Sequence, residues 1–147
     1  MLAGRIDPEI RTELDQRCQI LSYAQPALWL RVADRRLDSA EIDSLIEKSG
    51  VVLAPYQRFV GSSGVLLWAA RAGRPVLTQD FGLIGRLTRD HGLGLAIDSS
   101  DPGCLALAIE RIVESGAQAL FDPVGAQRFV ESRTPRHFAA MVFDGVA

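Results

Sequence analysis

Cysteine and histidine are scarce in this chain of 147 residues, which has two of each. His91 and His137 have no Cys, Asp or Glu partners at the spacing of a metal site, so the sequence predicts no bound metal. Cys18 and Cys104 lie far apart within helical patterns, which favours reduced, buried thiols over a disulfide bridge.

An excess of positive charge is also missing, because the formal net charge is −2. Binding to nucleic-acid backbones needs a basic surface, whereas Arg35 and its neighbours alternate with Asp34 and Asp38. The sequence has no secretory signal and no apolar run long enough to span a bilayer. We therefore expect a cytoplasmic protein without a nucleic-acid partner or a transmembrane segment. Peripheral contact of a surface helix with a membrane stays open.

Predicted strands and helices alternate along the chain. Short apolar runs indicate strands at 27–32, 51–54, 75–78 and 92–98. Helical patterns begin at Asp7, Leu37, Val65, Leu83 and Asp101, with further segments at 126–131 and 137–143. Strands separated by helices form a parallel sheet covered on both faces. The sequence therefore predicts an α/β, Rossmann-like three-layer sandwich in one domain over residues 1–147, with a first strand shortened to residues 1–3.

The segment 51–76 carries the strongest functional signal. An apolar strand leads into Gly61, Ser62, Ser63 and Gly64, and an apolar helix follows at once. Backbone N–H groups, the helix dipole and two hydroxyls would converge there, so the turn suits a phosphate. The same turn can be a plain strand-to-helix connection. It is not a hydrolase nucleophile elbow, because Val65 stands where the final glycine belongs.

The order of these segments resembles the C-terminal, donor-binding domain of a group 1, family 4-like glycosyltransferase of the two-Rossmann-domain (GT-B) type. The similarity runs from Leu2-Ala3-Gly4 to 93–98 and covers nearly the whole chain. Its most specific piece is the stretch 69–76, AARAGRPV, where the family reads roughly Glu-Ala-Met-Ala-x-Gly-x-Pro-Val. No single motif carries the resemblance, which rests on the ordered series.

The resemblance implies that the chain binds a nucleotide-sugar, the donor substrate, without a metal or other cofactor. The implied contacts are a phosphate site at Arg58, Gly61, Ser62, Ser63 and Gly64, a base site at Arg31 and Val32, and a donor-sugar turn at Gly82 and Leu83. No catalytic residue falls on this chain. A missing N-terminal Rossmann-like domain would be its partner and would hold the acceptor site, so we expect the isolated chain to be inactive.

Two alternatives stay open. The family places a glutamate on each side of the glycine and serine turn, and the matching residues here are Val60 and Trp68. Loss of both carboxylates favours a non-catalytic nucleotide-sugar-binding or scaffold module, and an indole such as Trp68 suits packing better than ribose binding. The other alternative is a different Rossmann-like protein, such as part of a sugar-nucleotide epimerase or a receiver-like domain.

Overall fold

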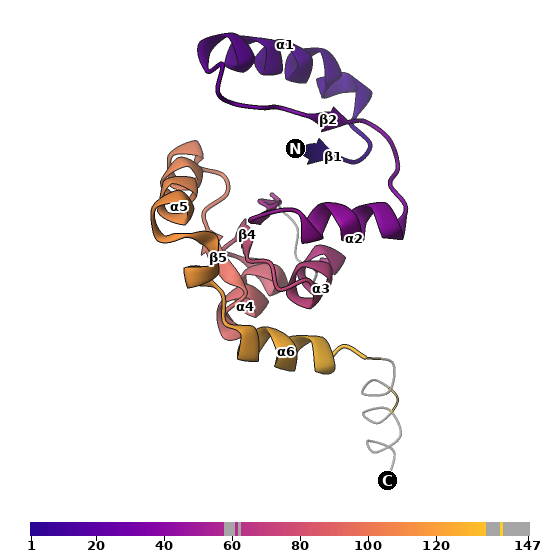
Figure 1. Cartoon of the computed structure of the whole chain (residues 1–147), viewed down its shortest axis with the longest axis vertical. Helices are drawn as coiled ribbons and strands as arrows, with labels where there is room; N and C mark the ends of the chain where they lie inside the picture. Colours follow the sequence, from indigo (N-terminus) through magenta and orange to yellow (C-terminus); the bar gives the residue numbers. More distant parts are fainter. Residues whose placement is uncertain (58–60, 62, 135–138, 140–147) are drawn as a thin grey trace. The chain divides into compact units, whose positions relative to one another are not determined.

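The computed structural model describes residues 1–57, 61, 63–134 and 139 (Figure 1). Contacts group the chain into two compact units, 1–42 and 43–147, and each is described by itself. The α/β class with parallel strands is confirmed, since both units pair their strands in parallel and connect them through helices. The expectation of one domain over 1–147 stays a prediction. The expected helix at 137–143 falls mostly outside the described residues.

The first unit contains a two-stranded parallel sheet of β1 (Leu2–Ala3) and β2 (Val32–Ala33), connected through α1 (Pro8–Ala24). Asp7 caps α1 by accepting a hydrogen bond from the Glu9 amide at 3.0 Å. Asp34, just after β2, accepts the Ile6 amide at 2.9 Å and pairs with Arg11 of α1. These polar contacts connect the helix to the end of the second strand.

One expectation for the first unit is wrong, because the strand predicted over 27–32 is reduced to β2 (Val32–Ala33). Helix α1 is present as predicted, but it contains no buried residue. Ile10, for example, is 54% exposed. Periodicity identified the helix correctly, but burial also requires a partner surface.

The second helix, α2 (Ser39–Glu47), includes residues of both units and begins with a capping box. The Asp38 carboxylate accepts the Glu41 amide at 2.8 Å, and the Glu41 carboxylate accepts the Asp38 amide at 3.1 Å. Arg35 donates to the same Glu41 carboxylate at 2.8 Å. The hydrogen bond from Arg35, followed by that from Asp38, lowers the pKa of Glu41 from 4.5 to about 2.

Because the folded chain lowers the pKa of Glu41, this capping box stabilises α2 above the ordinary glutamate pKa and loses that effect as the pH falls from about 4.5 to about 2. We expect the Asp38 amide resonance to titrate with a midpoint near 2 when followed by NMR. Glu41→Gln serves as the control and should abolish the transition. A midpoint at the ordinary glutamate value would contradict the assignment.

The second unit is built on a parallel sheet of β3 (Val52–Ala54), β4 (Val76–Gln79) and β5 (Gly94–Ile97), in that order. Helix α3 (Gly64–Arg71) connects β3 to β4, and α4 (Gly82–Asp90) connects β4 to β5. After β5 come α5 (Pro102–Ser115), the 3-10 turn η1 (Ala117–Leu120) and α6 (Pro123–Glu131). Apart from η1, these elements were predicted, with ends that shift by a few residues.

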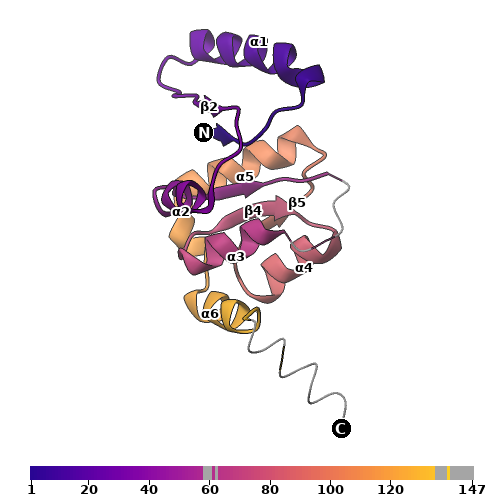
Figure 2. The ribbon, with the colours of Figure 1, turned by 90° about the vertical axis from the view of Figure 1, so that its right-hand side faces the viewer.

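Side chains of the sheet enter two separate cores. Val76 packs with Leu66, Ile84 and Phe129 in the core that α3, α4 and α6 share. Leu77, the next residue, packs with α5 on the other face. Figure 2 shows α5 on one side of β4 and β5, and α3 and α4 on the other. This alternation produces the expected three layers in the second unit.

Helix α5 buries only part of its apolar face. Ala108 and Ile112 are buried, while Ile109 is 41% and Val113 is 77% exposed. The helix therefore buries a narrower stripe than its apolar residues suggest.

Helix α4 lies very close to the end of β4. A Cβ on Gly85 would stand 2.4 Å from the backbone carbon and oxygen of Asp80. The buried Thr78 hydroxyl donates to Thr88 of α4 at 3.1 Å, and Thr88 donates to the Ile84 carbonyl at 2.9 Å. Glycine at 85 and this threonine pair together set the spacing between strand and helix.

Gly85→Ala should therefore destabilise the protein by about 1–3 kcal/mol, because backbone rather than a flexible side chain must move to make room. Urea denaturation measures the change. Gly50→Ala is the matched control, since a Cβ there meets nothing within 4 Å. Equal free energies of unfolding for the two variants would show that α4 is not tightly packed against the backbone at Asp80.

Candidate functional site

The loops at the carboxyl edge of the second unit's sheet are connected to one another. Ser99, after β5, donates its hydroxyl to the Tyr56 carbonyl at 3.0 Å, and Gln57 donates to the Ser99 carbonyl at 3.4 Å. Tyr56 and Gln57 follow β3, and β4 lies between β3 and β5 in the sheet. The two outer loops therefore meet beyond the end of the central strand, where ligands bind in open parallel sheets.

Helix α3 begins at this edge with Ser63 as its cap. The Ser63 hydroxyl oxygen accepts the Val65 amide at 3.2 Å and lies 3.3 Å from the Tyr56 hydroxyl. The Ser63 carbonyl accepts the Leu66 amide at 3.1 Å. Among the described residues, the Gly64 amide has no acceptor, and a Cβ on Gly64 would meet open space. Gly64 is an exposed residue, and the first turn of α3 directs the positive end of its dipole toward this edge.

The structure describes only part of the predicted phosphate turn. Gly61 is half-buried ahead of the cap, and Ser63 and Gly64 start α3 as expected. Arg58 and Ser62 lie outside the described residues.

The predicted donor-sugar turn also lies at a helix start. Gly82 opens α4 with a φ of +68°, a conformation that favours glycine, and Leu83 follows it, exposed. Phe81 precedes the helix and makes no side-chain capping bond. The predicted base site belongs to the other unit, where Val32 pairs with Leu2 and the Arg31 carbonyl accepts the Leu2 amide at 2.8 Å.

Three carboxylates gather at the same edge, and none of them was predicted to belong to a functional site. Asp80 follows β4, Asp98 follows β5 and Asp101 caps α5, and all three are exposed. A hydrogen bond from the Ser100 hydroxyl lowers the pKa of Asp98. The sequence could have indicated these three carboxylates, because each lies within a few positions of the end of a predicted strand.

These carboxylates act together on Cys104 in the first turn of α5. Its thiol donates to Asp101 at 3.3 Å, and the pKa of Cys104 is raised by this bond, by burial and by the charges of Asp101, Asp98 and Asp80. The carboxylates of Asp101, Asp98 and Asp80 place negative charge near the start of α5. Helix α3 differs, because it has a neutral cap and no acid in its first turn.

Both cysteines are free, as expected, but they are half-buried rather than buried. Asp101→Asn keeps a capping side chain and removes one charge, so we expect the pKa of Cys104 to fall and its alkylation by iodoacetamide to become faster at about pH 8.5. A Cys18→Ser background leaves Cys104 as the only thiol. An unchanged alkylation rate would show that the charge of Asp101 does not control the thiol.

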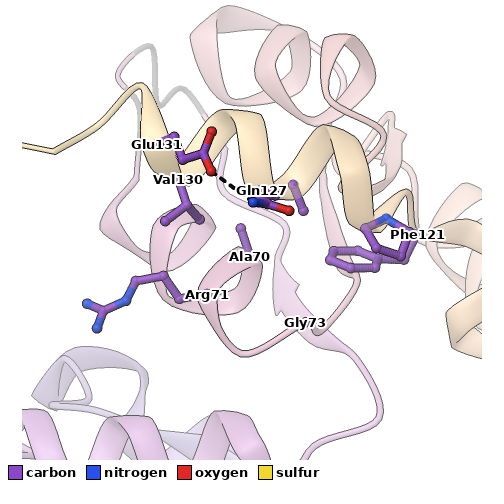
Figure 3. A pocket seen from close by; sticks show the side chains of 9 residues that line it. Ala70, Arg71, Gly73, Phe121, Gln127, Val130 and Glu131 are labelled. Carbon is purple, nitrogen blue, oxygen red and sulfur yellow. Dashed lines mark hydrogen bonds between the residues drawn. The ribbon is translucent and has the colours of Figure 1, made fainter. Parts of the chain in front are cut away.

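A groove of about 460 Å³ lies elsewhere on the second unit. Ala70 and Arg71 in the last turn of α3 line it together with Phe121 and Val130, and Gln127 donates to Glu131 along its α6 side at 2.9 Å (Figure 3). Because it borders the C-terminal end of α3, this groove is separate from the Gly64 edge.

Val60 and Trp68 occupy the two positions at which the glycosyltransferase family that the chain resembles has glutamates. Trp68 is half-buried in the middle of α3, and Val60 lies outside the described residues. No described group of three or more His, Cys, Asp or Glu side chains is arranged to hold a metal ion. The ring of His91 packs against that of Phe129 in a tilted arrangement, with ring centroids 5.1 Å apart.

None of the described helices has the length and apolar character needed to cross a membrane. No protein-family model matches the chain, and no curated protein matches it. The site must therefore be interpreted from its own geometry.

Proposed function

We propose that the 43–147 unit binds the diphosphate of a nucleotide-sugar at the N-terminus of α3, as the donor-binding part of a glycosyltransferase. The observation that carries this proposal is the exposed Gly64 at the start of α3, whose amide has no acceptor among the described residues and which stands at the carboxyl edge of a parallel sheet. Aligned backbone dipoles favour negative charge at such a position.

The charges at this edge support one orientation of the donor. Asp80, Asp98 and Asp101 repel a diphosphate from the start of α5, so the phosphates are expected at α3. Carboxylates are good acceptors for sugar hydroxyls, and Gly82 allows close backbone approach at the start of α4. The sugar would therefore point toward α4, as the resemblance implies for Gly82 and Leu83.

The rest of the enzyme is inferred from the resemblance alone. An N-terminal Rossmann-like domain would supply the acceptor site, and the isolated chain would not transfer sugar. Arg31 and Val32, the residues that the resemblance implies for the base, belong to the 1–42 unit, and their role stays a prediction. Localisation in the cytoplasm stays a prediction.

A non-catalytic binding module is the second candidate, favoured by Trp68 on α3. An indole offers only a donor, so it cannot accept hydrogen bonds from ribose hydroxyls as a glutamate does. Both candidates bind the nucleotide-sugar. The two candidates differ in one respect. Joined to an N-terminal domain that holds the acceptor site, the chain would transfer the sugar if it is part of an enzyme and would not transfer it if it is a binding module.

Calorimetric titration with uridine or guanosine diphosphate sugars tests the site. We expect the parent chain to bind these nucleotide-sugars weakly. The few contacts at this site only partly offset the translational and rotational entropy that is lost on binding. Gly64→Val should weaken it at least about tenfold, or about 1.4 kcal/mol, because a β-branched side chain blocks approach to the amide. A Cβ at 64 meets no neighbour, so the fold should persist.

Gly50→Val is the matched control, because Gly50 is equally open but precedes β3 at the other edge of the sheet. It should bind like the parent. Equal binding by Gly64→Val and the parent would refute the α3 site. Absence of binding by the parent would refute the proposed function itself.

A further inference from the structure

We draw no further inference here: the strongest candidate, the groove between the C-terminal end of α3 and helix α6 that Ala70, Phe121 and Val130 line, is an unpartnered apolar surface, and nothing in the described part of the chain shows what covers it.

Discussion

Close backbone contact on both sides of β4 is the constraint on which the second unit depends. A Cβ on Gly94 of β5 would stand 2.0 Å from the Val76 carbonyl oxygen, and one on Gly85 of α4 would stand 2.4 Å from the Asp80 carbonyl oxygen. Every residue of β4 is buried. Only glycine lets the neighbouring strand and helix approach so closely, since Gly94 pairs with Val76 at the start of β4 and Gly85 packs against Asp80 just beyond its end.

The chemistry of the helix caps divides that edge into two electrostatic regions. Helices α3 and α5 both begin there, and both direct the positive end of a dipole toward it. Ser63 caps α3 without adding charge, whereas the Asp101 carboxylate caps α5 and, with Asp98 and Asp80, raises the pKa of Cys104. A neutral cap leaves the dipole available to an anion, and a charged cap cancels it.

Local patterns predicted the elements of the second unit well, and predicted burial less well. Pro102 after Asp101 marked the start of α5 correctly, yet Val113, on the apolar face of that helix, is 77% exposed. Apolar periodicity shows which residues share a helix face. The width of the buried part of that face depends on how much apolar surface the sheet presents to the helix. The cap at Ser63 was also predictable, while its contact with Tyr56 joins residues that no local pattern relates.

The amino-acid sequence by itself determined the α/β class, the order of strands and helices and the glycine and serine turn before α3, because propensity, capping and periodicity act between near neighbours in the chain. Tertiary structure alone decided that Tyr56 contacts Ser99 across the end of β4, and that the charges of Asp80 and Asp98 act on Cys104 together with that of Asp101. Those contacts join separate strand ends, and parallel strand pairing brings them to one edge of the sheet.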